Sequence, residues 1–509
     1  DLKLLTPEDK VRAGIVDDLE DIDDYMLIST NERNPQAFDV YRLNVNTGEK
    51  KMIAENPGNI MGWITDHDGK LRVATASDGV NSVVLYRDTE EEPFKEVLVT
   101  NFRDELNPLF FTFDNKFMYA SSNLGRDKSA IVKFDIANGK ELELMYENPD
   151  VDVSGLSYSR KRKVLTTISY VKEKREMKFL DSETEKRYDR LKKELGDYEV
   201  VITGLNKNED KFLVRTYSDR SLGSYYFYDA ASDKLSKIVE VSPWLNENEL
   251  AVQKPVTYKS RDGLTIHGYL TLPVGVEPKN LPVVMNIHGG PWARDNWGFN
   301  PEVQFLANRG FAVLQVNYRG STGYGKKFWE ASFREWGKKM QDDVSDGVKW
   351  LISEGIANPK KVGIYGGSYG GYATLAGLAF SPELYACGVD YVGVSNLFTF
   401  MKTIPPYWEP FRKMMYEMVG NPEVDSALFV SASPVFHADK IVAPLFVAQG
   451  KMDPRVNIAE SDQMVEAMKK RGVEVEYMVK DNEGHGFRNE ENRFDFYGAM
   501  ETFLKKHLK

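Results

Sequence analysis

The sequence predicts a two-domain protein, in which an all-β β-propeller precedes an α/β domain with a doubly wound, mostly parallel sheet. Its 509 residues exceed the length that one hydrophobic core usually organises, so two domains are expected. A strand pattern recurs at a nearly constant interval in the first half, whereas strand-like and helix-like segments alternate in the second. We therefore expect a propeller over residues 1–245 and an α/β domain over residues 246–509.

The repeat of the first half is clearest in residues 40–48 and 131–139, which align in register over nine positions. Further strand-like runs follow the same pattern, and we take as equivalent the positions Asn44, Arg87, Asp135, Asp181 and Asp229. By subtraction their intervals are 43, 48, 46 and 48 residues. A period of about 40–50 residues is typical of four-stranded propeller blades. We count five units; a β-sandwich also fits alternating strands and polar turns, but it imposes no fixed long period.

The second half alternates the two kinds of segment that build a parallel sheet covered by helices. Strands are predicted at residues 283–287, 311–316, 362–365 and 444–448, and helices at residues 343–353 and 459–470. The segment G-G-S-Y-G-G-Y at residues 366–372 lies between a strand-like run and a helix-like run, with Ser368 at the turn.

Ser368 is the candidate nucleophile of this domain. Gly366 and Gly370 complete the pattern G-x-S-x-G, in which small residues let strand and helix approach closely and expose the serine hydroxyl. The alternative is an ordinary serine in a tight turn, so the interpretation depends on whether catalytic partners follow.

Two downstream residues suit those partners. An activated serine needs a base and an acid that orients the base, and in this type of domain they follow in the order Ser, Asp or Glu, His. Of the three histidines after Ser368, only His485 lies in a short glycine-flanked loop after a strand-like run. Asp453 lies between them, in the segment at residues 450–456.

Donors for an oxyanion are also predicted. One is the backbone N–H of Tyr369, which follows the nucleophile, and another is expected from a glycine-rich loop after a buried strand. Such a loop is present, because residues 283–287 run directly into H-G-G-P at residues 288–291. Within that turn, His288 is expected to be structural or to line the pocket, not to act as a base or metal ligand.

Composition excludes several other classes of function. A net charge of −11 and a pI near 5.4 argue against a nucleic-acid-binding surface. No segment approaches the about 18 consecutive apolar residues of a membrane span, so no membrane partner is expected. No metal-binding or dinucleotide-binding motif is present, so we expect neither metal nor cofactor. The only cysteine, Cys387, lies in an apolar run and is expected to be buried.

The cellular location follows only in part from the sequence. We expect a soluble protein and favour the cytoplasm. A periplasmic or secreted location stays open, because the chain begins at Asp1 without an initiating methionine.

Taken together, these motifs resemble the prolyl oligopeptidase family, in which a β-propeller accompanies an α/β-hydrolase domain. The resemblance rests on H-G-G-P, on N-Y-R-G-S-T-G-Y-G at residues 317–325, on G-G-S-Y-G-G-Y, on D-P-R-V at residues 453–456 and on E-G-H-G-F at residues 483–487. It is most similar to the acylaminoacyl peptidase and dipeptidyl aminopeptidase branch. The resemblance implies a triad of Ser368, Asp453 and His485, with oxyanion donors at the backbone N–H groups of Gly290 and Tyr369. Relatives commonly have seven blades, so five units imply either a reduced propeller or two blades upstream of the sequence.

The function that this resemblance implies is a serine peptidase for short peptides, since a propeller would restrict access to the site. It would be an exopeptidase that releases N-terminal acylamino acids or dipeptides through an acyl-enzyme. Trp408 and Glu409 are candidates for substrate binding, the first as a pocket wall and the second as a partner of the substrate amine; a rigid surface loop is the alternative. A carboxylesterase for small acyl or feruloyl esters is the competing function, and a non-enzymatic propeller module is a third. Association into a homo-oligomer is left open.

Overall fold

The computed structural model describes residues 4–6 and 9–509, and these divide into two compact units. The first unit comprises the described residues up to 185 together with residues 207–209 and 410–414, and the second comprises residues 186–206, 210–409 and 415–509. No helix among the described residues is long and apolar enough to cross a membrane.

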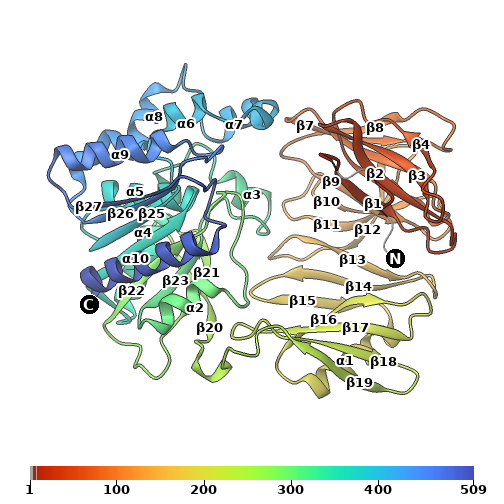
Figure 1. Ribbon diagram of the computed structural model, residues 1–509, viewed down its shortest axis with the longest axis horizontal. Helices are drawn as coiled ribbons and strands as arrows, with labels where there is room; N and C mark the ends of the chain where they lie inside the picture. Colours follow the sequence, from red (N-terminus) through yellow and green to blue (C-terminus); the bar gives the residue numbers. More distant parts are fainter. Residues whose placement is uncertain (1–3, 7–8) are drawn as a thin grey trace. The chain divides into compact units, whose positions relative to one another are not determined.

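Four antiparallel sheets follow one another in the first unit (Figure 1), and each is built from consecutive strands. The first two contain β1 (Ala13–Asp17), β2 (Tyr25–Asn34), β3 (Ala37–Asn44), β4 (Lys50–Ala54), and β5 (Ile60–Thr65), β6 (Leu71–Ser77), β7 (Asn81–Tyr86), β8 (Lys95–Asn101). The next two contain β9 (Leu106–Phe111), β10 (Met118–Ser122), β11 (Ala130–Asp135), β12 (Lys140–Tyr146), and the three strands β13 (Val153–Ser159), β14 (Val164–Val171), β15 (Arg175–Phe179). A fifth sheet of the same kind contains β16 (Glu199–Leu205), β17 (Lys211–Tyr217), β18 (Ser224–Asp229), β19 (Lys234–Glu240). The predicted five-bladed β-propeller is therefore confirmed.

The predicted repeat positions lie at or just beyond the end of the third strand of each blade. Asn44, Asp135 and Asp229 are the last residues of β3, β11 and β18. Arg87 follows β7 directly, and Asp181 lies two residues beyond β15. Each blade buries alternate strand residues and turns at polar positions, which is why one period recurs in the sequence.

The turn between the first and second strands joins each blade to the next. The contacts run from Thr65 to Asp17, from His67 to Asn115, from Phe113 to Tyr158, from Lys161 to Asn208, and from Lys207 to Asp21. All these residues belong to the first unit, which explains why residues 207–209 of the fifth blade group with it.

The fourth blade has a helix where the others have an outer strand, and the sequence did not reveal it. Helix α1 (Ser182–Leu195) is strongly polar, with acidic residues in its first turn and lysines in its last, an arrangement that suits the helix dipole. The Asp181 carboxylate accepts hydrogen bonds from the backbone N–H and the hydroxyl of Thr184. Leu191 packs with Val200 and Phe212 of the fifth blade.

The second unit contains a sheet of eight strands in the order β20-β21-β23-β22-β24-β25-β26-β27. The strands are β20 (Gln253–Lys259), β21 (Thr265–Thr271), β22 (Leu281–Ile287), β23 (Ala312–Asn317), β24 (Ala357–Gly367), β25 (Cys387–Tyr391), β26 (Leu445–Gly450), β27 (Val475–Lys480). Pairing is antiparallel between β20, β21 and β23 and parallel for the rest. The predicted doubly wound, mostly parallel sheet is confirmed.

Helices cover both faces of this sheet (Figure 1). The helices that contact its strands are α2 (Pro301–Asn308), α4 (Lys339–Ser353), α5 (Tyr369–Phe380), α9 (Ile458–Lys470) and α10 (Glu490–Leu508). The remaining helices are α3 (Lys326–Glu330), α6 (Leu397–Lys402), α7 (Arg412–Met418) and α8 (Ser426–Ala432). Helices α2 and α10 pack on one face, in a cluster that contains Tyr365 and the fully buried Cys387. Neighbouring Ile364 points the other way, toward Gly377 of α5. Side chains of successive strand residues point to opposite faces, so residues 362–366 of β24 are buried on both.

The fifth blade belongs to the second unit because polar side chains tie it to the eight-stranded sheet. The side-chain amide of Gln304 donates to the carbonyl oxygen of Asp219 at 2.9 Å. The backbone N–H of Gln253 donates to the Asp219 carboxylate at 2.8 Å. Asp219 follows β17, whereas Gln253 begins β20.

Candidate active site

The turn between β24 and α5 holds Ser368 in a conformation that few side chains adopt. Its φ is +60° and its ψ −117°, a strained combination for a residue with a side chain. The strand and helix approach so closely that only glycine fits beside the serine. A Cβ on Gly366 would lie 2.4 Å from the carbonyl oxygen of Ile287, and a Cβ on Gly370 would lie 2.0 Å from the same oxygen. The two glycines of G-x-S-x-G therefore permit the strained turn.

The three residues selected from the sequence lie in one chain of hydrogen bonds. His485 Nε2 lies 3.0 Å from Ser368 Oγ, and His485 Nδ1 lies 2.7 Å from Asp453 Oδ2. The Asp453 side chain is fully buried, whereas 15% of the His485 side chain is exposed. A buried carboxylate on Nδ1 holds the tautomer in which Nε2 faces the serine hydroxyl, the arrangement that general-base activation requires.

Asp453 also fixes its own loop after β26. Its Oδ1 accepts the backbone N–H groups of Arg455 at 2.8 Å and Val456 at 2.9 Å. The side-chain amide of Gln449 lies 3.4 Å from the other carboxylate oxygen. Each oxygen of Asp453 is therefore satisfied, and the one nearest the site is aimed at the imidazole.

Glu483 performs the equivalent task for the loop that carries His485. Its buried carboxylate accepts the backbone N–H groups of Arg488 and Asn489, both at 2.9 Å, and the side-chain amide of Asn492 at 2.7 Å. Burial acts to raise its pKa, but these hydrogen bonds prevail and lower the pKa to about 2. The motif E-G-H-G-F contained Glu483, yet nothing in the sequence indicated that its carboxylate folds back on the following residues.

The loop after β22 places its glycines, not its histidine, beside the serine. A Cβ on Gly289 would lie 3.3 Å from Ser368 Cβ, so the loop backbone approaches the nucleophile closely. The His288 ring stacks on Tyr318 with 4.4 Å between centroids, and its two nitrogens lie 2.8 Å from the Gly289 carbonyl oxygen and 3.0 Å from Ser321 Oγ. Burial lowers the pKa of His288 to about 4, so the imidazole is neutral near pH 7.

Further hydrogen bonds fix the rest of this loop against the sheet. Asn317, at the end of β23, accepts the Asp295 N–H at 2.7 Å and donates to the Asp295 carbonyl oxygen at 3.0 Å. The side chain of Gln253 accepts the N–H of Gly298 at 3.0 Å. The chain that follows the H-G-G-P segment is thus held against β20 and β23.

The two backbone groups predicted to bind an oxyanion lie in these two loops. Tyr369 is the first residue of α5, so its N–H has no acceptor one turn earlier in the helix. Gly290 follows Gly289 in the loop that contacts the serine, with a φ of +126° that glycine adopts readily. Their role as oxyanion donors stays a prediction.

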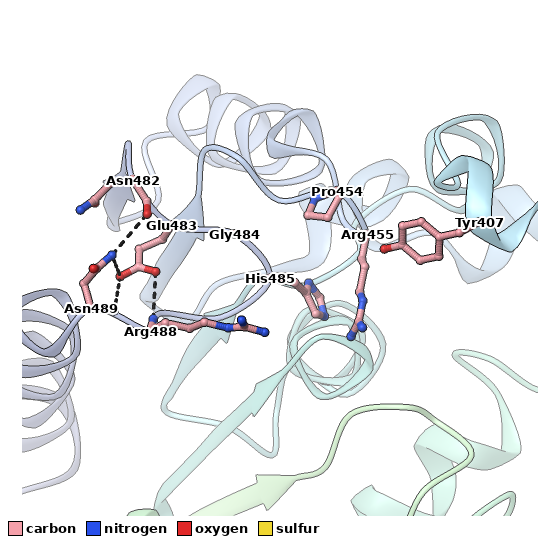
Figure 2. Close-up of a pocket in the computed structure, with 9 residues that line it drawn as sticks. All are labelled: Tyr407, Pro454, Arg455, Asn482, Glu483, Gly484, His485, Arg488 and Asn489. Atoms are coloured by element: carbon pink, nitrogen blue, oxygen red, sulfur yellow. Dashed lines mark hydrogen bonds between the residues drawn. The ribbon is translucent and has the colours of Figure 1, made fainter. Parts of the chain in front are cut away.

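A pocket of about 440 Å³ opens beside His485 (Figure 2). It is lined by Tyr407 and Arg455 and by the loop that carries His485 and Arg488. Trp408 and Glu409 are not among its lining residues; Trp408 is half-buried and Glu409 exposed in the 3-10 helix at residues 406–411. Their predicted contact with substrate stays a prediction, whereas Tyr407 and Arg488 had no signal in the sequence.

A serine at a strained strand-to-helix turn, with an imidazole and a buried carboxylate aligned behind it on a mostly parallel sheet, defines a serine hydrolase of the α/β-hydrolase fold.

Comparison with known proteins narrows this class of enzyme to one family. The model of the prolyl oligopeptidase family matches residues 297–509. The dipeptidyl aminopeptidase BIII of Pseudoxanthomonas mexicana is 37% identical, over 99% of this chain and 75% of its own. The dipeptidyl peptidase family member 6 of Caenorhabditis elegans is 34% identical, over 96% of this chain and 70% of its own. The chain therefore belongs to the prolyl oligopeptidase family and is a serine peptidase.

More distant proteins share only part of the chain or only the fold. The acylamino-acid-releasing enzyme of Arabidopsis thaliana is 27% identical over 45% of this chain and 30% of its own. The structure of a puromycin-hydrolysing peptidase of Mycobacterium tuberculosis superposes with a TM-score of 0.76 at 19% identity, covering 95% of this chain and 77% of that one. This likeness at low identity confirms the architecture of a propeller and a hydrolase domain.

Proposed function

We propose that this enzyme is a dipeptidyl aminopeptidase, which releases dipeptides from the N-terminus of short peptides through an acyl-enzyme on Ser368. The observation that carries the proposal is the position of His485 between Ser368 and Asp453, at 3.0 Å and 2.7 Å. That geometry suits attack on a carbonyl by a serine hydroxyl.

In the first half of the reaction, His485 Nε2 takes the proton of Ser368 as Oγ attacks the carbonyl carbon of the second residue of the peptide. The Asp453 carboxylate stabilises the resulting imidazolium, and the backbone N–H groups of Tyr369 and Gly290 bind the negative oxygen of the tetrahedral intermediate. His485 then gives its proton to the leaving nitrogen, the C–N bond breaks, and the dipeptide remains as an ester on Ser368.

In the second half, water replaces the leaving amine. His485 takes a proton from water as the water oxygen attacks the ester carbonyl. His485 then returns that proton to Ser368 Oγ when the C–O bond breaks. One water is consumed for each dipeptide released. All the groups that transfer protons or bind charge belong to the second unit.

Release of dipeptides, instead of acylamino acids, is supported by the range over which relatives match. The two dipeptidyl peptidases align with 96–99% of this chain, propeller included, whereas the acylamino-acid-releasing enzyme aligns with 45%. An enzyme that releases dipeptides must bind the substrate N-terminus two residues away from the scissile bond. Similarity over both domains therefore supports this specificity better than similarity over the hydrolase domain alone.

A matched substrate series tests this function. A dipeptidyl aminomethylcoumarin with a free amine, its N-acetyl form, an N-acetyl aminoacyl analogue and a p-nitrophenyl ester are compared by kcat/KM. We expect the free dipeptidyl amide to be the best amide substrate and Ser368→Ala to be inactive on it. Faster release from the N-acetyl aminoacyl substrate would overturn the dipeptide assignment, and cleavage of the ester alone would favour a carboxylesterase.

A further inference from the structure

The nucleophile and the base lie in loops that are far apart in the chain. Ser368 follows β24, whereas His485 follows β27, and β25 and β26 lie between these two strands in the sheet. The 3.0 Å between Ser368 Oγ and His485 Nε2 therefore depends on contacts that hold the two loops at a fixed spacing. Catalysis is sensitive to that spacing, because a misplacement of about 1 Å can reduce a rate by about 10²-fold.

Tyr391 contacts both loops. It is the last residue of β25 and lies opposite Gly367, the residue before the nucleophile, in the parallel pairing of β24 and β25. Its backbone carbonyl oxygen accepts the N–H of Ser368 at 2.9 Å. Its side-chain hydroxyl accepts the N–H of Phe487, two residues beyond His485. One residue thus holds the serine turn through its backbone and the histidine loop through its side chain.

The ring of Tyr391 is itself fixed by packing. It stacks on Phe496 of α10 with 4.5 Å between centroids, and it meets Phe487 edge-on at 5.2 Å. A Cβ on Gly367 would lie 3.4 Å from Tyr391 Cδ1, and a Cβ on Gly486 would lie 3.6 Å from the hydroxyl oxygen. Both glycines therefore let the chain approach the ring closely. Packing of this kind restricts the rotamer, so the backbone of β25 sets the position of the hydroxyl.

Tyr391 holds a part of the histidine loop that Glu483 does not. The Glu483 carboxylate accepts hydrogen bonds from residues 488–492, which lie further along the chain. The Phe487 N–H donates to Tyr391 instead, and it lies closer to His485 in the chain than any group that Glu483 holds. The two anchors also differ in where they lead, because only Tyr391 connects the loop to the serine turn through a single residue.

We propose that Tyr391 is a positioning residue for the proton transfer between Ser368 and His485. Its hydroxyl fixes the backbone at Phe487, and thereby the imidazole, at the spacing that the serine turn requires. Because the hydroxyl acts through His485 and not on the substrate, its loss should lower kcat and leave KM unchanged. The inference rests on the acyl-enzyme chemistry proposed above for Ser368, and not on the preference for dipeptides.

Tyr391→Phe removes the hydroxyl and keeps both the carbonyl contact with Ser368 and the ring packed on Phe496. We expect kcat for the dipeptidyl aminomethylcoumarin to fall by about tenfold, comparable to the loss of one hydrogen bond, with no change in KM. The rate at which a fluorophosphonate labels Ser368 should fall by the same factor, because labelling needs the same proton transfer but no peptide. An unchanged kcat, or an effect on KM alone, would overturn the proposal.

A double variant shows whether the effect passes through the histidine. In the His485→Ala background, Tyr391→Phe should cause no further loss in the single-turnover rate, since no imidazole is left to position. An equal loss in both backgrounds would show that Tyr391 supports the serine turn or the oxyanion donors, and would overturn its role toward His485.

Tyr497→Phe is the matched control. Tyr497 packs on the same Phe496, with 5.3 Å between centroids, but its hydroxyl donates to Glu302 of α2 at 3.0 Å. The control therefore loses the same atom from the same apolar cluster and should keep the kcat and the labelling rate of the wild type. All variants are assayed well below their Tm. A loss of kcat in Tyr497→Phe equal to that in Tyr391→Phe would assign both effects to a weakened cluster and overturn the positioning role.

Fluorophosphonate labelling separates failure of this inference from failure of the proposed function. If the wild type is labelled but does not release the coumarin, the dipeptidyl function is wrong, and labelling rates alone decide the role of Tyr391. If the coumarin is released and Tyr391→Phe is as active as the wild type, the positioning role is wrong and the dipeptidyl function stands. A wild type that is neither labelled nor active would overturn both.

Discussion

Two histidines follow strands of the same sheet in glycine-containing loops, and their surroundings differ in every respect that matters for proton transfer. His485, after β27, has a carboxylate on one ring nitrogen and a serine hydroxyl on the other. His288, after β22, stacks on Tyr318 and contacts a carbonyl oxygen and Ser321. Its pKa is lowered to about 4 by burial, and no carboxylate contributes to offset that effect. A glycine-containing loop therefore does not by itself place a histidine between a buried carboxylate and a serine hydroxyl, the geometry that a general base requires.

The largest expected effect tests the His485 half of this comparison. His485→Ala and Ser368→Ala should each lower kcat by at least about 10³-fold, since catalysis then comes only from binding and the oxyanion donors. Because the two residues transfer one proton between them, the double variant should be no slower than either single variant. Multiplicative losses, measured with the dipeptidyl coumarin under single-turnover conditions, would show that they do not act as a unit.

Asp453→Asn should follow, with a loss of about 10² to 10⁴-fold in kcat. An asparagine amide favours the wrong imidazole tautomer, but its carbonyl oxygen still accepts the N–H groups of Arg455 and Val456. The variant should therefore melt close to the wild-type temperature while it loses activity. A loss of activity that tracks a lower Tm would instead assign Asp453 a structural role.

The sequence predicted what depends on local pattern. The repeat positions lie at the end of the third strand of every blade or within two residues of it, because inward and outward residues alternate alike in each. Ser368, Asp453 and His485 lie in contact although 85 and 117 residues of chain separate the serine from its partners, since their order and flanking glycines are characteristic of this hydrolase turn.

What the sequence did not predict depends on side chains that meet only in three dimensions. Helix α1 escaped detection because its polar composition resembles a long turn and it interrupts the strand period. Glu483 lay within a quoted motif, but its role comes from hydrogen bonds to residues five to nine positions later. Arg488 and Tyr407 come together from separate segments to line one pocket, which no spacing in the sequence encodes.

Glu483→Gln tests whether the His485 loop needs its anchor, with a smaller expected effect of about tenfold in kcat/KM from the loss of charge-assisted hydrogen bonds. The folded-state pKa of Glu483, about 2, lies below its ordinary value of 4.5. Its carboxylate therefore stabilises the fold above about pH 4.5, and that contribution disappears as the pH falls toward 2.

Calorimetry between pH 6 and pH 3 measures this effect. The Tm difference between wild type and Glu483→Gln should shrink on acidification. Glu491→Gln, which removes an exposed charge from the first turn of α10, serves as the control; it should leave activity unchanged and lower Tm only slightly, through the helix dipole. A Tm difference that stays constant with pH would show that the Glu483 charge does not stabilise the loop.

His288→Asn should have the smallest effect on activity and thereby sharpen the contrast with His485. The His288 ring stacks on Tyr318 and hydrogen-bonds behind the loop, and it does not contact Ser368. We therefore expect less than about a tenfold loss in kcat/KM, comparable to one hydrogen bond.

The larger effect of His288→Asn should be on the pH dependence of stability. The folded-state pKa of His288, about 4, lies below the ordinary value of 6.5. Between these values the unfolded chain binds a proton at this position and the folded protein does not, so acidification from pH 6.5 to pH 4 destabilises the wild type through this residue. Asparagine has no such proton, and the Tm of the variant should fall less steeply over that interval when both are melted at matched ionic strength. Parallel Tm profiles would contradict a neutral imidazole in the folded protein. A loss of activity equal to that of His485→Ala would place His288 in the proton-transfer chain and abolish the distinction between the two loops.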